Sequence, residues 1–155
     1  MRSIFSLTGK TILITGASSG IGKAVAQQCA VAGATCIITA RNKSRLKHTL
    51  DSLEGEGHQM VIADLVDLSS IERLSSELPK LNGVVCCAGV VETKMLKFSE
   101  DDDLQQLFYT NAFSVIRLVR ILVQQKLLHK ESSIVIISSI SGVKCGYLGG
   151  SIYGA

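Results

Sequence analysis

The sequence predicts an α/β fold, a doubly wound parallel sheet with helices on both faces. Short apolar runs alternate with helical patterns along the chain, which is typical of right-handed strand–helix–strand crossovers. Hydrophobic residues make up 46% of the chain and aromatic residues 5%, which suits buried parallel strands rich in aliphatic side chains. A glycine-rich turn also joins the first strand to the first helix. The 155 residues suffice for one domain with a core, and we expect one domain over residues 1–155.

The apolar runs and helical patterns define nine elements. We expect strands near 11–15, 35–39, 59–63, 82–87 and 133–138, and helices near 20–32, 42–54, 68–77 and 102–128. Gly33 lies where a helix C-cap is expected, and Asp67 is an N-cap for the third helix. Pro79 ends the third helical pattern, and Asp101–Asp103 place negative charge at the start of the long helix. The expected strand order is 3-2-1-4-5.

The turn after the first strand has the sequence Thr15-Gly16-Ala17-Ser18-Ser19-Gly20-Ile21-Gly22. Gly16 allows a sharp turn at the end of the strand, Gly20 allows the backbone to approach a pyrophosphate, and Gly22 allows the helix to pack close to the sheet. Free N–H groups and the positive end of the helix dipole then face the anion. This pattern indicates a phosphate-binding turn.

Further motifs follow in a consistent order. Asp64 ends the third strand, Cys86-Cys87-Ala88-Gly89 ends the fourth, Asn111 lies on the long helix, and Ser139 and Tyr153 come last. Together with the glycine turn, this set resembles the short-chain dehydrogenase/reductase family, in which the fourth strand usually ends in Asn-Asn-Ala-Gly. The resemblance implies a Rossmann fold. It covers essentially the whole chain, and it implies that the chain is the front portion of the family's domain, truncated on its C-terminal side. The family's active-site lysine would fall two positions after Ala155.

The resemblance also implies roles for individual residues. Asp64 would contact the adenine, and Asn111 would support a water in the proton relay. Ser139 would donate a hydrogen bond to the substrate carbonyl, and Tyr153 would be the acid/base. The family's serine often lies thirteen residues before the tyrosine rather than fourteen, so Ser141 remains a lesser candidate. The complete sets are, for cofactor binding, Gly16, Ser18, Ser19, Gly20, Ile21, Gly22, Arg41, Asp64, Ala88 and Gly89, and, for catalysis, Asn111, Ser139 and Tyr153.

Two of these residues also carry an argument of their own. Asn111 lies on the apolar stripe of its helix, where a buried amide must be hydrogen-bonded. At the end of the second strand, Ala40 occupies the place where an acid would hold the ribose 2′-OH of NAD. Arg41 follows it and is placed to pair with a 2′-phosphate. We therefore expect NADP as the cofactor, with NAD less favoured.

Three functions fit these patterns. The first is an NADP-dependent oxidoreductase that transfers a hydride between the nicotinamide and a small carbonyl or alcohol substrate. The second is a truncated, non-catalytic dinucleotide-binding domain. The third is an α/β-hydrolase, because Gly16–Gly20 also fits Gly-x-Ser-x-Gly with Ser18 as nucleophile. That function needs an acid and then a histidine downstream. His48 and His58 flank a predicted helix far from the strand ends, and His129 ends the long helix.

Charge, cysteine content and hydropathy indicate which partners and cell compartments to expect. The net charge of +3 is small and unclustered, so we expect no nucleic-acid partner. The cysteines at 29, 36, 86, 87 and 145 lack zinc-ligand spacing, which favours a reduced cytoplasmic protein without a metal site. The start, Met1–Phe5, has no signal-peptide pattern, and no apolar stretch reaches the roughly 18 residues of a membrane span. We expect no membrane partner, and a homo-oligomer for the full-length form.

Overall fold

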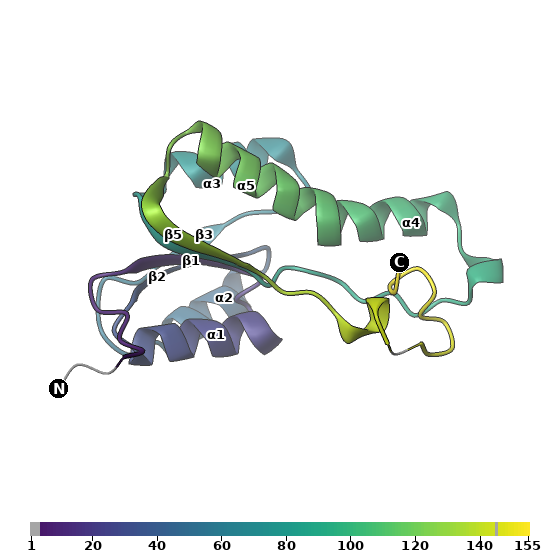
Figure 1. Cartoon of the computed structure of the whole chain (residues 1–155), viewed down its shortest axis with the longest axis horizontal. Coiled ribbons are helices and arrows are strands. Elements are labelled where there is room, and N and C mark those ends of the chain that lie inside the picture. Colours follow the sequence, from purple (N-terminus) through teal and green to yellow (C-terminus); the bar gives the residue numbers. More distant parts are fainter. Residues whose placement is uncertain (1–3, 145) are drawn as a thin grey trace.

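Five parallel strands form one sheet in the order β3-β2-β1-β4-β5, as the alternation predicts (Figure 1). The computed structural model describes residues 4–144 and 146–155. Cys145, considered above for zinc-ligand spacing, and residues 1–3, considered for a signal peptide, lie outside the described residues. The strands are β1 (Thr11–Thr15), β2 (Thr35–Ala40), β3 (Gln59–Ile62), β4 (Leu81–Cys86) and β5 (Leu128–Ile136).

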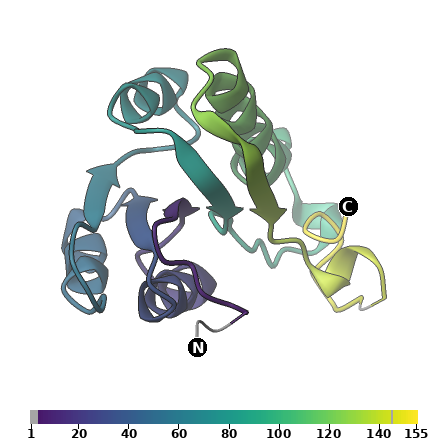
Figure 2. The same cartoon turned by 60° about the vertical axis from the view of Figure 1, so that its left-hand side comes forward.

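Helices cover both faces of the sheet (Figures 1 and 2). On one face lie α1 (Gly20–Val31) and α2 (Lys43–Leu50), and on the other lie α3 (Leu68–Ser76) and α5 (Ser114–Gln124). Two buried apolar clusters fill the space between the layers. The fold class is therefore confirmed as a doubly wound α/β domain of the Rossmann type.

Alternate residues of β1 and β2 belong to opposite clusters, as the pleat requires. In β1, Leu13 packs toward α3 and α5, whereas Ile12 and Ile14 pack toward α1 and α2. In β2, Ile37 and Cys36 divide in the same way. Both faces of the central strands are apolar because helices cover both.

The predicted long helix consists of three parts. It begins as α4 (Asp101–Phe108), passes through a π-helical turn, η2 (Tyr109–Phe113), and continues as α5. A π turn inserts one residue into the helical ladder, and periodicity over 27 expected residues does not reveal it.

The prediction that this helix extends to residue 128 is wrong. The helix ends at Gln124 because Lys126 adopts a left-handed conformation, with φ of 56°. The Leu127 N–H donates to Leu122 O and the Lys126 N–H donates to Val123 O, so the end is a Schellman motif with lysine in the usual glycine position. Strand β5 then begins at Leu128, five residues before the expected start.

The second helix also ends earlier than predicted, at Leu50 rather than 54. The chain between α2 and β3 turns through Gly55 and Gly57, both with positive φ. His58 fixes this turn: its Nδ1 accepts from the Cys36 N–H at 3.0 Å, and its Nε2 lies 2.8 Å from Glu54 O. The imidazole of His58 is therefore engaged in holding β2 and β3 together.

The predicted caps of α1 and α3 and the acidic first turn of the long helix are confirmed. The Asp67 carboxylate caps α3 by accepting from the Ser69 N–H at 3.0 Å. Gly33 follows α1 with φ of 92°, a conformation that favours glycine. Asp101–Asp103 lie in the first turn of α4, and Asp103 completes a capping box with Glu100.

The α4–η2–α5 run, Asp101–Gln124, is long and apolar enough to cross a membrane by length and composition alone. A core helix of a globular domain meets the same criteria. Val115, Leu118, Ile121 and Leu122 of α5 are buried in the cluster shared with α3 and the sheet. Packing accounts for the apolar residues on this face of α5, whereas Ile116 and Val123 of the same helix are exposed.

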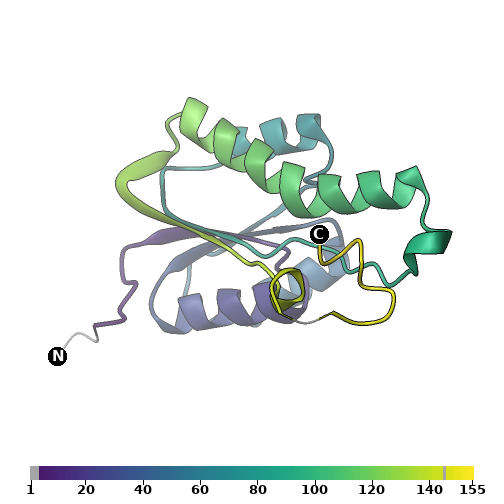
Figure 3. The ribbon, with the colours of Figure 1, turned by 45° about the vertical axis from the view of Figure 1, so that its right-hand side comes forward.

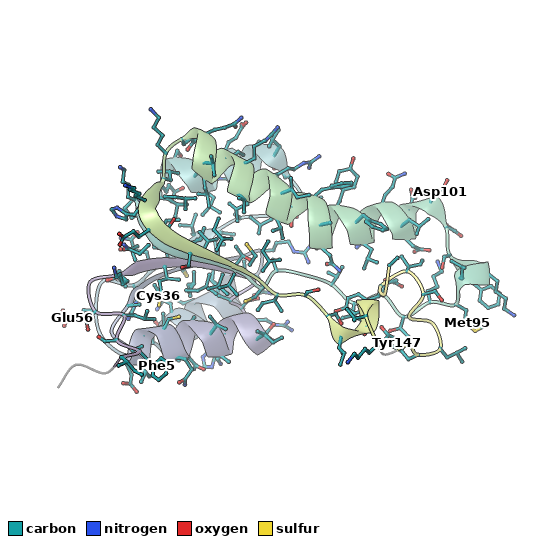
Figure 4. All side chains as sticks on the ribbon, in the orientation of Figure 1. Phe5, Cys36, Glu56, Met95, Asp101 and Tyr147 are labelled. Atoms are coloured by element: carbon teal, nitrogen blue, oxygen red, sulfur yellow. The ribbon has the colours of Figure 1, made fainter. Side chains whose placement is uncertain are left out.

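The C-terminal segment returns to the connection between β4 and α4. Figure 3 shows this segment (yellow) beside the 3-10 turn η1 (Leu96–Phe98) and the chain before it. The Lys94 N–H donates to Gly149 O at 2.9 Å, and Figure 4 shows Met95 and Tyr147 at the same end of the molecule. The short helix η3 (Ile140–Gly142) links β5 to this segment.

Candidate functional site

A groove of about 540 Å³ runs along the carboxyl ends of the strands, where doubly wound sheets bind ligands. The loops after β1, β2, β3 and β4 line it, together with the π turn and the start of α5. Its volume is within the range of small-molecule sites. All ten residues that the sequence proposes for cofactor binding line the groove: Gly16, Ser18, Ser19, Gly20, Ile21, Gly22, Arg41, Asp64, Ala88 and Gly89.

The glycine turn lies at the middle of the groove. A Cβ on Gly16 would lie 2.7 Å from Ala88 N, and a Cβ on Gly22 would lie 2.5 Å from Gly16 O, so both positions exclude a side chain. Gly20 has φ of 52° and no atom within 4 Å of a built Cβ, so its side toward the groove is open. Packing therefore excludes a side chain at Gly16 and Gly22. Gly16 and Gly20 both have a positive φ, and open space beside the backbone distinguishes Gly20.

The N-terminus of α1 faces this turn without a side-chain cap. Ser19 occupies the N-cap position in extended conformation and makes no side-chain cap hydrogen bond. The first N–H groups of a helix need an acceptor from outside the helix. An anion at the glycine turn would provide it, together with a favourable interaction with the helix dipole.

Thr15 joins the glycine turn to the end of β4. Its Oγ1 accepts from the Cys87 N–H and the Ala88 N–H, each at 3.1 Å. Sequence reasoning missed this role. The signal was the threonine before Gly16, but its acceptor function requires two strands that are 72 residues apart to lie side by side.

Cys86 and Cys87 point to opposite sides of the sheet, into different apolar clusters. Burial raises the pKa of Cys86 to about 11 and also raises the pKa of Cys87. Both therefore remain thiols at neutral pH and act as small apolar side chains in the sheet. Within residues 4–144 and 146–155, no group of His, Cys, Asp and Glu side chains could hold a metal ion.

The loop after β2 brings positive charge to one end of the groove. Arg41 is exposed, and Arg45, which sequence reasoning did not single out, also lines the groove from the first turn of α2. Among the described residues neither forms an ion pair with a carboxylate. Asn42 holds this turn by accepting from the Arg45 N–H at 2.9 Å.

The loop after β3 holds Asp64 beside the same end. The Asp64 N–H donates to Ser70 Oγ at 3.0 Å, and its Oδ1 accepts from the Val66 N–H at 3.1 Å. Within the described chain, its other carboxylate oxygen has no hydrogen bond. That oxygen can accept from a ligand.

Asn111 lies in the π turn with its amide fully engaged. Its Oδ1 accepts from the Val90 N–H and its Nδ2 donates to Val90 O, both at 2.8 Å. Val90 lines the groove, whereas Asn111 does not. The half-buried amide is satisfied, as sequence reasoning requires, and its partner is the loop after β4.

Ser139 and Tyr153 also lie outside the lining of the groove. Ser139 caps η3, and its Oγ accepts from the Ser141 N–H at 3.2 Å. A Cβ built on Gly154 would lie 3.0 Å from Ser141 O, so the residue after Tyr153 packs against the serine turn. The structure thus brings the two segments together beside the groove rather than in it.

Several features of the groove suit a phosphate-bearing ligand. Gly16 and Gly22 leave a cradle that a Cβ would fill, and the uncapped end of α1 needs an acceptor. Thr39 Oγ1, at the border of the groove, is buried without a hydrogen-bond partner in the described structure. Two cationic side chains lie at one end, where a phosphate would complement them. The donor set fits a phosphate-bearing ligand.

A hydrolase centre fits less well. Ser18 lines the groove, but none of the described residues that line it is a histidine. His58 is engaged by the backbone of Cys36 and Glu54. Among the described residues that line the groove, Ser18 therefore has no histidine to act as the general base that a nucleophile elbow needs.

Comparison with known proteins supports the same family. The model of the short chain dehydrogenase family matches residues 10–155. A 3-oxoacyl-[acyl-carrier-protein] reductase of Rickettsia felis is 32% identical over 140 residues, covering 90% of this chain and 58% of that protein. The corresponding reductase of Salmonella typhimurium is 31% identical, covering 88% and 57%. The chain therefore spans about three fifths of the length of the curated relatives it matches.

Solved structures resemble this chain in both fold and sequence. A short chain dehydrogenase/reductase family protein superposes with a TM-score of 0.84 at 34% identity, over 96% of this chain and 63% of its own. A dehydrogenase/reductase from Sinorhizobium meliloti 1021 gives 0.86 at 28% identity, over 97% and 62%. Because the family match extends over nearly the whole chain, the protein belongs to the short-chain dehydrogenase/reductase family.

Proposed function

We propose that the chain binds NADP(H) and contributes to hydride transfer between this cofactor and a small carbonyl or alcohol substrate. One observation carries the proposal: the groove combines the glycine turn at the start of α1 with Arg41 after β2, where Ala40 occupies the place of an acid. A carboxylate there would bind the ribose 2′-OH of NAD and repel a 2′-phosphate. A guanidinium attracts that phosphate.

Different groove residues would contact different parts of such a cofactor. Arg41 would pair with the 2′-phosphate, and the free carboxylate oxygen of Asp64 would accept from the adenine. The glycine turn and the start of α1 would hold the pyrophosphate. Ala88 and Gly89, which line the other side of the groove, would lie along the remaining part of the cofactor.

The chemistry needs a hydride source, an oxygen ligand and a proton. When bound, the nicotinamide supplies or accepts the hydride. Ser139 would donate a hydrogen bond to the carbonyl oxygen, on which negative charge develops, and Tyr153 would exchange the proton with that oxygen. Asn111 would support the proton relay while it fixes Val90.

A second candidate is dinucleotide binding without catalysis. The observation that favours it is that Asn111, Ser139 and Tyr153 all lie outside the lining of the groove. Under either function we propose a cytoplasmic protein with a small-molecule ligand, no nucleic-acid or membrane partner and, in a full-length form, a homo-oligomer. The modest, unclustered charge supports the absence of nucleic acid.

The test is a titration of NADPH and NADH against the parent and two variants. Arg41→Ala should weaken NADPH binding roughly tenfold or more and leave NADH binding unchanged, because a charge-assisted pair is lost. Lys43→Ala is the matched control, since it removes the same charge from α2 at a residue that does not line the groove. Equal affinities of the parent for both cofactors would refute the choice of NADP.

Carbonyl-dependent oxidation of NADPH separates the two candidates. A rate that falls in Tyr153→Phe supports the oxidoreductase. Cofactor binding without any oxidation supports the binding domain instead.

A further inference from the structure

Arg117, on the first turns of α5, contacts two parts of the molecule that sequence reasoning did not connect. Its Nη1 donates to Val66 O at 3.3 Å, in the loop after β3. Its guanidinium carbon lies 5.0 Å from the centre of the Tyr109 ring, at the start of the π turn. The side chain therefore bridges a groove loop and the π turn.

Both polar backbone groups of Val66 are hydrogen-bonded to side chains. Its N–H donates to Asp64 Oδ1 at 3.1 Å, and its carbonyl oxygen accepts from Arg117. Both Asp64 and Val66 line the groove. The first bond fixes one carboxylate oxygen of Asp64 and leaves the other for a ligand, so the orientation of Val66 determines where the free oxygen points.

The aromatic partner restrains Arg117 in turn. A guanidinium over an aromatic face is attracted by the ring, more strongly where water is excluded. Tyr109 itself packs edge-on against Phe113, with ring centres 5.2 Å apart and planes at 67°. These rings lie at the two ends of the π turn. The contact with Phe113 orients the Tyr109 ring, over which the guanidinium lies.

The same turn fixes the opposite wall of the groove, since Asn111 holds both polar backbone groups of Val90. The α4–η2–α5 run therefore contacts the loop after β4 through Asn111 and the loop after β3 through Arg117. Arg117 is half-buried, and among the described residues it has no carboxylate partner. Its hydrogen bond goes to the carbonyl oxygen of Val66, in a loop that lines the groove.

We infer that Arg117 is a positioning residue for the adenine end of the groove: it holds Val66, and through it Asp64, in the orientation that accepts an adenine. The inference rests on the proposed dinucleotide function. It assigns to α5 a part in cofactor recognition, although Arg117 does not itself line the groove.

The test compares 5′-AMP with inorganic pyrophosphate as ligands, by calorimetry on the whole chain. Arg117→Ala should weaken 5′-AMP binding roughly fivefold to tenfold, the scale of one ordinary hydrogen bond, and leave pyrophosphate binding unchanged. Arg120→Ala is the matched control, because Arg120 is an exposed arginine on the same helix, outside the groove. It should bind both ligands as the parent does. Arg117→Lys keeps the charge and should restore part of the affinity.

Tyr109 provides the second arm. Tyr109→Phe keeps the ring and should bind 5′-AMP normally, whereas Tyr109→Leu should lose part of the affinity. The Arg117→Ala, Tyr109→Leu double variant should bind no worse than Arg117→Ala alone, because Tyr109 acts through Arg117.

The inference is overturned if Arg117→Ala binds 5′-AMP as Arg120→Ala does, if it loses pyrophosphate to the same extent, or if the two substitutions add. A parent that binds no adenine nucleotide refutes the proposed function and the inference with it. A parent that binds 5′-AMP while Arg117→Ala is unchanged refutes the inference alone.

Discussion

The Thr15 hydroxyl oxygen lies 3.1 Å from Ala88 N and joins the end of β1 to the chain just after β4, the strand that pairs with β1 in the sheet. The same oxygen accepts from the Cys87 N–H. One side chain thus satisfies two consecutive backbone donors where the chain leaves the sheet.

Thr15→Val should therefore be strongly destabilising although it preserves the shape of the side chain. Two donors beside a buried residue lose their acceptor, at about 1–3 kcal/mol each. Thr15→Ser keeps the oxygen and should cost about 1 kcal/mol for the lost methyl group. Urea unfolding of the two variants measures the difference. A smaller loss of unfolding free energy in Thr15→Val than in Thr15→Ser would mean that the methyl group, not the hydroxyl, matters.

The glycine turn gives a second prediction, in which Gly20 and Gly22 differ. In Gly22→Ala the new Cβ would lie 2.5 Å from Gly16 O and 3.0 Å from Thr15 O, so α1 must move away from the sheet. We expect a loss of about 1–3 kcal/mol in unfolding free energy and a loss of cofactor binding. Gly20→Ala meets no atom and carries only the strain of a positive φ, about 1–2 kcal/mol. Thermal unfolding and a cofactor titration on both variants check whether Gly22→Ala is the more damaging substitution.

How far the sequence predicts the structure depends on whether the signal is local. Strand β1 matches its predicted range, because an apolar β-branched run followed by a glycine is a local pattern. The start of β5 was missed because His129–Glu131 are polar and read as the tail of a helix, whereas Leu128 pairs with Leu81 through the backbone. Lys126 in a left-handed conformation has no signature in composition.

The same division holds in the groove. Gly16, Arg41 and Asp64 follow strand ends, and parallel strands bring their carboxyl ends to one edge, so their position in the groove is predictable. The roles of Thr15, Arg45 and Arg117 depend on contacts between segments that are distant in sequence or on the direction of a side chain. Periodicity carries neither kind of information.

Asn111 offers a third prediction, which uses the direction of its two hydrogen bonds. Asn111→Leu leaves both polar groups of Val90 without partners, and we expect a loss of about 2 kcal/mol in unfolding free energy. Asn111→Asp keeps an acceptor for the Val90 N–H but places a carboxylate against Val90 O at neutral pH. A protonated carboxyl could donate to that oxygen, so its deficit relative to the parent should shrink as the pH falls below about 5. A deficit independent of pH would contradict this geometry.

The fourth prediction concerns the pH dependence of stability and Cys36. This thiol lies between the sheet and α1 (Figure 4), is fully buried and donates to Ala26 O at 3.6 Å. Burial raises the pKa of Cys36 from 9.0 to about 12, and the neighbouring Cys29 adds to the shift. The unfolded chain therefore releases this proton near pH 9, whereas the folded chain keeps it. Between pH 9 and about 12 the folded state binds more protons, so stability must fall as the pH rises.

Cys36→Ala tests the assignment. It should cost stability at pH 7, because a buried sulfur is lost from a packed cluster. Above pH 9 its unfolding free energy should fall less steeply than that of the parent, since the other titrating groups are common to both proteins. Guanidinium unfolding at pH 7.5, 9.0 and 10.5 gives the two slopes. Parallel slopes would show that another group, rather than the Cys36 thiol, accounts for the alkaline loss of stability.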